Sequence, residues 1–158
     1  VTFKSILSRW ASGVTVVTCR REPEGIHGMT ASAFTSVSLE PPLVLICVDR
    51  RHKTHRYIQR QGAFGIHVLG AGMDDISDRC AGFFGEQGHW LEGEPWRAGV
   101  TGAPLLERNL AWMECSLWQA YDGGDHTIFV GKVEAGGAAD GRPLLWFERG
   151  YRALPDLE

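Results

Sequence analysis

The sequence lacks a C-x-x-C pair, although it contains four cysteines. Cys19, Cys47, Cys80 and Cys115 lie far apart in the chain. This spacing excludes the zinc-ribbon and thioredoxin signatures. Three of the four lie in or beside apolar runs, where a buried, reduced thiol is the simpler interpretation. Reduced thiols are typical of a reducing compartment, so we expect a cytoplasmic protein.

Long apolar runs and an excess of positive charge are also absent. No stretch comes near the roughly 18 apolar residues of a membrane-spanning helix, and the start of the chain shows no signal-peptide pattern. The net charge of −3 argues against general binding to nucleic acid or to a membrane surface, so any basic patch must be local. The chain begins at Val1 without a methionine, as expected of a trimmed chain or of one cut from a longer protein.

The common nucleotide-binding and hydrolase motifs are missing as well. Gly70-Ala71-Gly72 begins like a dinucleotide fingerprint, but no third glycine follows, and Asp74-Asp75 would repel a diphosphate. The sequence also has no P-loop and no G-x-S-x-G motif. A Rossmann enzyme and a serine hydrolase are therefore disfavoured.

What the sequence does contain is typical of one globular domain over residues 1–158. Hydrophobic residues make up 44% and charged residues 22%, which are ordinary values for a globular protein. A chain of this length is long enough to build a core. Twenty glycines indicate many turns, as in an all-β framework with short connections. Periodicity predicts helices at 3–10, 53–61 and 73–81 and a loop at 82–104. It predicts strands at 13–19, 28–39, 43–48, 65–69, 110–121, 127–133 and 144–147.

These elements favour an antiparallel β-barrel with a few short peripheral helices, because closure removes exposed strand edges. A parallel α/β sheet fits less well, since the strands do not alternate with long helices. Strand 43–48 is apolar throughout and is expected to be buried on both faces. Gly131 is expected to mark a bulge in the strand at 127–133.

A run of small residues at 29–33 suggests a surface for a flat ring. Small side chains let a ring lie close to the backbone, whose N–H and C=O groups can bond its polar edge. Thr30 and Ser32 add hydroxyl groups. The alternative is a strand that packs closely against another element.

A basic cluster, defined here as residues 50–56, follows the apolar strand and begins a predicted helix. Backbone N–H groups, the helix dipole, Lys53 and Thr54 could together hold one phosphate. The alternatives are a solvated helix start and, less well supported, a nucleic-acid patch. His52 and His55 have no third ligand nearby, so no metal site is expected.

Gly124-Asp125-His126 forms a tight turn that presents an acid and an imidazole at the start of a strand. A histidine in a loop on a rigid strand suits ligand binding or proton handling. The alternative is that Asp125 caps the turn while His126 is merely exposed. The residues alone leave the two interpretations evenly balanced.

Together these stretches resemble the short-chain flavin reductase family, the reductase components of two-component flavin monooxygenases. The resemblance covers about residues 3–154. It depends on the motifs at 13–18, 28–44 and 124–133, and it is completed by 143–147 and 150–152. The family implies a single FMN-binding split β-barrel, antiparallel and Greek-key-like, that forms a homodimer. It also implies NADH- or NADPH-driven reduction of FMN or FAD, with the reduced flavin passing to a separate monooxygenase.

The resemblance also implies which residues form the site. Thr30, Ala31, Ser32 and Ala33, with the neighbouring Met29, would line the flavin ring, and Ser36 and Ser38 would lie near the ring or ribityl chain. Arg50, Lys53 and Thr54 would meet the phosphate. Arg79, Cys80 and Ala81 match an Arg-Phe-Ala run near the flavin tail, with Cys80 in place of the usual phenylalanine. Gly124, Asp125 and His126 match the nicotinamide-nucleotide motif, and Arg9 and Tyr151 are further substrate-binding candidates.

Hydride would pass directly between the two cofactors, so no catalytic side chain is expected. Two related functions stay open. One is a non-catalytic flavin-binding protein of the same fold. The other is a flavin oxidase of the pyridoxamine-phosphate oxidase type, against which the turn at 124–126 argues. A structural or interaction module is the weakest alternative.

Overall fold

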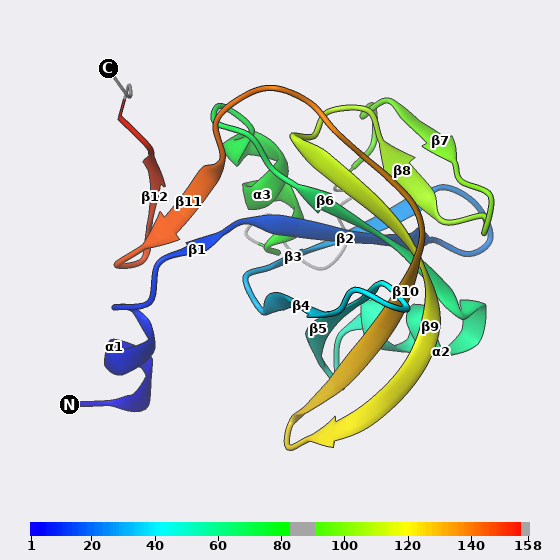
Figure 1. Cartoon of the computed structure of the whole chain (residues 1–158), viewed down its shortest axis with the longest axis horizontal. Coiled ribbons are helices and arrows are strands. Elements are labelled where there is room, and N and C mark those ends of the chain that lie inside the picture. The colour runs from blue at the N-terminus through cyan, green and yellow to red at the C-terminus, as the bar shows by residue number, and fades with distance from the viewer. Residues whose placement is uncertain (83–90, 156–158) are drawn as a thin grey trace.

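The computed structural model describes residues 1–82 and 91–155, and this part of the chain is mainly β-structure (Figure 1). It contains three short helices, α1 (Phe3–Leu7), α2 (Lys53–Gln61) and α3 (Asp74–Cys80). The strands are β1 (Ser12–Gly13), β2 (Thr15–Arg20), β3 (Ile26–Ala31), β4 (Phe34–Ser38), β5 (Leu43–Asp49), β6 (Ala63–Val68), β7 (Trp96–Ala98), β8 (Pro104–Leu106), β9 (Ala111–Gly123), β10 (His126–Ala138), β11 (Leu144–Phe147) and β12 (Gly150–Ala153). The expectation of a mainly β, antiparallel fold with few helices is confirmed.

Seven strands form one antiparallel sheet in the order β3-β2-β6-β9-β10-β5-β4. The two edge strands, β3 and β4, are consecutive in the chain, and only Ser32 and Ala33 connect them. The span from the end of β3 to the start of β4 is at most about 11 Å. The sheet therefore curls so that the end of β3 lies close to the start of β4 at this corner. Inside the curl lies a core in which Ile46, Phe64 and Phe129 are fully buried.

The expected single strand at 28–39 is wrong, because the chain breaks at the corner. The amide N of Phe34 donates to the Ser32 carbonyl O over 2.9 Å, which turns the backbone there. β3 then pairs with β2, whereas β4 pairs with β5. Burial of strand 43–48 on both faces is also wrong. In β5, buried and half-buried residues alternate, and the half-buried ones include Cys47.

The long hairpin of β9 and β10 is longer than the expected strands. A register shift between Val130 and Gly131 confirms the predicted bulge. A Cβ added to Gly131 would lie 2.7 Å from Phe64 Cζ and 2.9 Å from Cys115 Cβ. Glycine is therefore required for close packing at this point of the sheet.

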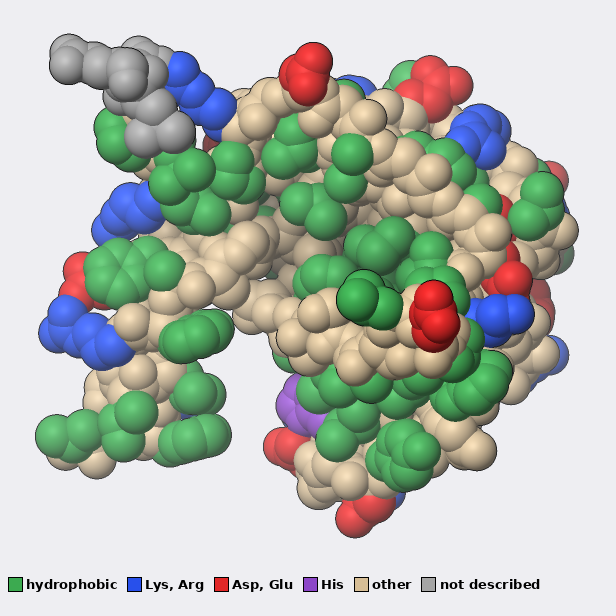
Figure 2. Space-filling view, in the orientation of Figure 1, with side chains coloured by type: hydrophobic (Ala, Val, Ile, Leu, Met, Phe, Trp, Pro, Cys, Tyr) green, Lys and Arg blue, Asp and Glu red, His purple; other side chains and the backbone are tan. Residues whose placement is uncertain are grey.

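A small second sheet, in the order β1-β11-β12, stands beside the main sheet and carries α1 (Figure 1). The expected C-terminal tail at 150–151 is part of strand β12. Figure 2 shows hydrophobic side chains on the side of the α1 column that faces the main body. Phe3, Ile6 and Trp10 of this region are exposed. The gap between the two parts leads to the candidate site.

Two further elements differ in how well the sequence predicts them. Helix α2 matches its predicted range, because His52 caps its N-terminus, Gly62 ends it with a φ of 66°, and Thr54, Tyr57 and Ile58 face the core. The expected loop at 82–104 instead contributes the paired strands β7 and β8, and its residues 83–90 lie outside the described part. No helix in the described residues is both long and apolar enough to cross a membrane.

Candidate functional site

The larger of two adjacent cavities lies between the α1 column and strands β4 and β5. Its volume is about 570 Å³, and its walls include the aromatic side chains of Trp10, Phe34 and Trp146. Ser32 and Ala33, two of the predicted flavin-ring residues, lie in its wall at the corner where the sheet edges meet. The volume is within the range of about 300–1,000 Å³ that is typical of ligand sites. The cavity can therefore accept a planar aromatic ligand.

The smaller cavity has a volume of about 210 Å³ and shares Ser32 and Trp146 with the larger one. Three other predicted site residues also line it, namely Thr30, Ala81 and Tyr151. Thr30 comes from strand β3, Ala81 follows the last residue of helix α3, and Tyr151 comes from strand β12, so the three are distant in sequence. The two cavities thus bring together five predicted residues, Thr30, Ser32, Ala33, Ala81 and Tyr151, with unpredicted neighbours that include Trp146.

Tyr151 is held in place from the α3 side. Its hydroxyl lies 2.6 Å from Asp78 Oδ1 and 2.8 Å from Ser77 Oγ. Burial and the hydrogen bond to Asp78 raise the pKa of Tyr151 to about 12. The Thr30 hydroxyl donates to the Ser77 carbonyl O over 2.6 Å, so α3 fixes both sides of the smaller cavity.

Trp146 and Cys47 line the cavities but were not expected to. The Trp146 ring packs edge-on against Tyr151, with ring centroids 5.1 Å apart. The Cys47 amide N donates to the Ala33 carbonyl O over 3.2 Å, and partial burial raises the pKa of its thiol. Trp146 lies in a motif that carries the family resemblance, but nothing in the residue pattern indicates its contacts.

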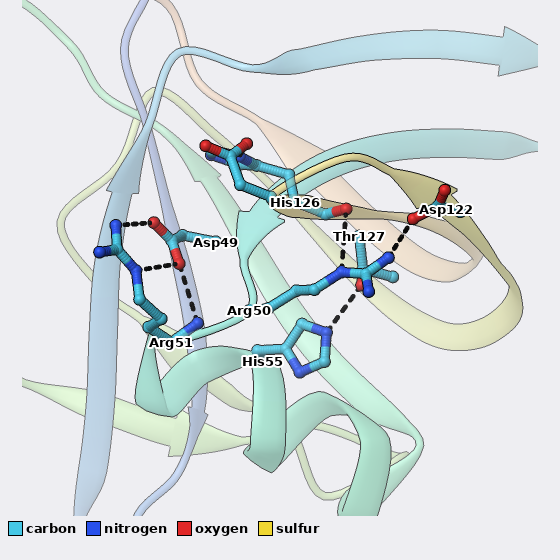
Figure 3. A network of polar contacts seen from close by, with 8 residues as sticks. Asp49, Arg50, Arg51, His55, Asp122, His126 and Thr127 are labelled. Atoms are coloured by element: carbon cyan, nitrogen blue, oxygen red, sulfur yellow. Dashed lines mark hydrogen bonds and ion pairs between the residues drawn. The ribbon is translucent and has the colours of Figure 1, made fainter.

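Most side chains of the basic cluster have partners within the protein (Figure 3). Arg50 pairs with Asp122, and the Arg51 guanidinium lies 2.8 Å from Asp49 Oδ2. Hydrogen bonds from Arg51 hold the pKa of Asp49 well below its usual range. His55 Nε2 lies 2.8 Å from the Thr127 hydroxyl.

Thr54, predicted to meet the phosphate, is fully buried. Its hydroxyl lies 2.8 Å from His27 Nε2 and 2.9 Å from His52 Nδ1. Burial, with the nearby positive charges of His52 and Lys53, lowers the pKa of His27 to about 3.

The side chain of Lys53 is exposed and has no ion-pair partner among the described residues. Arg56 is also exposed without an ion pair in the described part of the chain, but its guanidinium lies 5.8 Å from the Tyr57 ring centroid. Lys53 is the first residue of α2 and is therefore the better placed of the two to meet an anion at the start of the helix.

The predicted nucleotide turn is a neighbour of the basic cluster, although about 70 residues separate them. His126 pairs in register with Asp49, and the Arg50 amide N donates to the Asp125 carbonyl O over 3.1 Å. The Asp125 carboxylate lies 2.6 Å from His126 Nδ1, and the His126 side chain stays 41% exposed. Figure 3 shows His126 beside Asp49 and Arg50. Asp125 thus orients an imidazole that is open to solvent, and whether this imidazole binds a ligand stays a prediction.

The other predicted residues do not line either cavity. Met29 and Ala31 are buried in the main core. Arg79 pairs with Glu94 at 2.7 Å, and Arg9 pairs with Glu148. The remaining ones are Ser36, exposed on β4, Ser38, half-buried on β4, Gly124, exposed with a φ of 79°, and Cys80, whose buried thiol has a pKa raised to about 12.

The comparisons with known proteins agree with this geometry. The family described as flavin reductase like domain matches residues 7–155. The chain belongs to this family. An NADH-dependent flavin reductase from Rhodococcus sp is 41% identical over 154 residues, covering 96% of this chain and 84% of that protein. The 4-hydroxyphenylacetate 3-monooxygenase reductase component from Thermus thermophilus is 44% identical over 153 residues, covering 96% of this chain and 95% of that protein.

Solved structures give the same result for this flavin reductase like chain. The flavin reductase component of a bacterial two-component tryptophan halogenase is 41% identical and has a TM-score of 0.87. The alignment covers 98% of this chain and 97% of that one. The resemblance to flavin reductases is therefore confirmed for the chain as a whole, whereas the roles of single residues stay predictions.

Proposed function

We propose that this chain is an NADH-dependent flavin reductase that supplies reduced flavin to a separate monooxygenase. The observation that carries this proposal is 41–44% identity, over nearly the whole chain, to an NADH-dependent flavin reductase and to a monooxygenase reductase component. Bound flavin would accept a hydride from the dihydronicotinamide, and this chemistry belongs to the two cofactors. The role of the protein is to bind them in contact and to orient them.

The residues around the larger cavity fit a flavin ring. Ser32 and Ala33 are small and exposed, and they line the same cavity as the aromatic rings of Trp10 and Trp146. The open imidazole of His126, oriented by Asp125, is the proposed contact for the nicotinamide nucleotide. Lys53 is the proposed contact for the flavin phosphate. No side chain is assigned a role as nucleophile.

We further propose the finer family properties for this chain, namely a split barrel, a homodimer and a cytoplasmic location. The two sheet edges that meet at Ser32 and Ala33 support the barrel. The exposed apolar side chains of Phe3 and Ile6, which do not line the cavity, support contact with a second copy of the chain. Four unpaired thiols support a reducing compartment. Light scattering of the purified protein would measure the oligomeric state, and a monomer would contradict the homodimer.

Steady-state kinetics with FMN or FAD and with NADH or NADPH tests the proposed function. We expect oxidation of NADH that depends on both flavin and protein, followed as loss of nucleotide absorbance. No consumption above the control without protein would contradict the enzymatic function. Stopped-flow mixing separates the alternatives, since a non-catalytic flavin binder would show no flavin bleaching on addition of NADH. An oxidase would act on a substrate other than the nucleotide.

His126→Ala tests the proposed nucleotide contact. Because the imidazole is exposed, its removal should leave the fold intact. We expect a higher KM for NADH and a nearly unchanged flavin Kd. An unchanged KM for NADH with a higher flavin Kd would mean that His126 contacts the flavin and not the nucleotide.

A further inference from the structure

Two basic side chains, Lys4 and Arg149, line the larger cavity, and within the described part of the chain none of its lining residues is acidic. We call these two residues the cavity rim. Lys4 belongs to helix α1, and Arg149 lies in the turn between β11 and β12. A cavity that combines aromatic walls with two cations is suited to a planar ligand that carries an anionic group.

The cations of the rim are free to bind such a group. Among residues 1–82 and 91–155, neither Lys4 nor Arg149 has a side-chain hydrogen bond or an ion-pair partner. Their neighbour Arg9 differs, because it pairs with Glu148. The pairing of Arg9 leaves Arg149 as the unpaired arginine at this end of the cavity.

The backbone at Arg149 is held in an unfavourable conformation. Glu148 and Arg149 have φ values of 50° and 61°, in the left-handed region that glycine or asparagine usually occupies in such two-residue turns. The Glu148 amide N donates to the Ser8 carbonyl O over 3.0 Å, and the ion pair with Arg9 adds a second link to this segment. Strained residues that their surroundings hold in this way cluster at ligand sites.

From these observations we infer that Lys4 and Arg149 bind the diphosphate of the nicotinamide nucleotide. The inference builds on the proposed function, in which two anionic ligands must be held at once. The proposed contact for the flavin phosphate, Lys53, follows the end of β5, beyond Cys47 and Asp49. The rim lies on the opposite wall of the cavity, formed by α1 and the β11–β12 turn. Each anionic ligand then has its own cations.

Binding of NAD⁺, which cannot transfer a hydride, provides the first test. Calorimetric titration should give an NAD⁺ Kd about tenfold higher for Arg149→Ala, since charged hydrogen bonds are lost. Lys4→Ala should have a smaller effect in the same direction. Arg152→Ala is the matched control, because Arg152 is exposed on β12 and, among the described residues, its side chain bonds only the carbonyl of Tyr151. Unchanged NAD⁺ affinity in Arg149→Ala would overturn the inference.

A hydride donor without a diphosphate provides the second test. N-benzyl-dihydronicotinamide should reduce flavin at the same rate with the wild type and with Arg149→Ala, whereas NADH should show a raised KM with the variant. Equal losses with both donors would mean that Arg149 acts only on the structure, and would overturn the inference. If Arg149→Ala lost affinity for FMN but not for riboflavin or NAD⁺, the rim would bind the flavin phosphate instead. That result would also overturn the inference. Wild-type protein that used neither donor would contradict the proposed function itself.

Discussion

The basic cluster at 50–56 and the cavity rim both carry positive charge, but they use it differently. In the cluster, Arg50 and Arg51 pair with carboxylates, and the hydroxyl of Thr54 is buried between two histidines. In the rim, Lys4 and Arg149 face a cavity without a carboxylate. Density of charge along a sequence is therefore a poor guide to free charge in the fold. A long-range ion pair such as Arg50–Asp122 removes a cation that the sequence presents as available.

Acid should have the largest effect, because below about pH 6.5 it protonates two histidines in the unfolded chain before it does so in the folded chain. These are His27, which bonds Thr54 of the cluster, and His67, which bonds Val16 and Leu106 instead. The pKa of His27 is lowered to about 3 and that of the buried His67 to about 4, mainly by burial. Between these values and about 6.5, the unfolded chain binds protons that the folded chain does not. Stability is therefore full above about pH 6.5 and falls as the pH falls. The loss is up to about 1.4 kcal/mol per pH unit for each histidine.

Urea unfolding at several values between about pH 7 and about pH 5 measures this slope. The two histidines together predict a fall of up to about 3 kcal/mol per pH unit. His27→Gln should reduce the slope, even if it also lowers stability at neutral pH. A stability that does not change over this range would contradict the neutral, buried state of these histidines.

Thr54→Val tests the claim that this hydroxyl is structural. The substitution keeps the shape but leaves His27 and His52 without their shared partner, and such a loss costs about 2 kcal/mol of unfolding free energy. For a domain of this size, about 2 kcal/mol corresponds to a fall in Tm of about 4–8 °C. Thr35→Val is the control, because Thr35 is exposed on β4, and its Tm should stay near that of the wild type. Equal Tm values for the two variants would mean that the Thr54 hydroxyl is not structural, and its predicted role in phosphate binding would stand.

The sequence predicts the elements of this fold better than it predicts the partners of individual side chains. Helix α2 and strand β11 match their expected ranges because local capping and apolar pattern decide them. The break at Ser32 and Ala33 contains no glycine or proline from which it could be predicted. It arises because the segments before and after it pair with two different strands. Glu114 is similar: its buried carboxylate accepts hydrogen bonds from Thr101 Oγ1 and the Val100 amide, which lie in the loop between β7 and β8.

The candidate site shows the same limit. The run at 29–33 indicated a ring site, and the structure places Ser32 and Ala33 in a cavity wall, whereas Met29 and Ala31 alternate into the core. The resemblance assigned Tyr151 but not the Trp146 that packs against it. Lys4 and Arg149 lie at opposite ends of the chain, so only the fold brings them to one cavity. The alternation of side chains along a strand can be predicted from the sequence, but contacts between segments that are distant in the sequence cannot.

Lys53→Ala should have a smaller effect than Thr54→Val, and the effect should be on FMN affinity and not on stability. Because its charge is exposed and unpaired, its loss should leave stability unchanged and raise the Kd for FMN about tenfold. The Kd for riboflavin, which lacks the phosphate, should not change. Arg51→Ala is the matched control, since Arg51 is committed to Asp49 and its loss should change FMN affinity less than about twofold. Equal losses of FMN and riboflavin affinity would remove Lys53 from the phosphate site.

Substitution of Arg9 should have the smallest effect on NAD⁺ affinity. It tests which residues belong to the cavity rim. The resemblance makes Arg9 a substrate-binding residue, yet in the structure it pairs with Glu148 and its side chain is 74% exposed. An exposed ion pair contributes about 0.5 kcal/mol, so Arg9→Ala and Glu148→Ala should each change the NAD⁺ Kd by about twofold. If Arg9 acts only by holding Glu148, the double variant should be no worse than either single one. If Arg9→Ala weakens NAD⁺ binding about tenfold in the Glu148→Ala background as well, Arg9 contacts the nucleotide directly and belongs with Lys4 and Arg149.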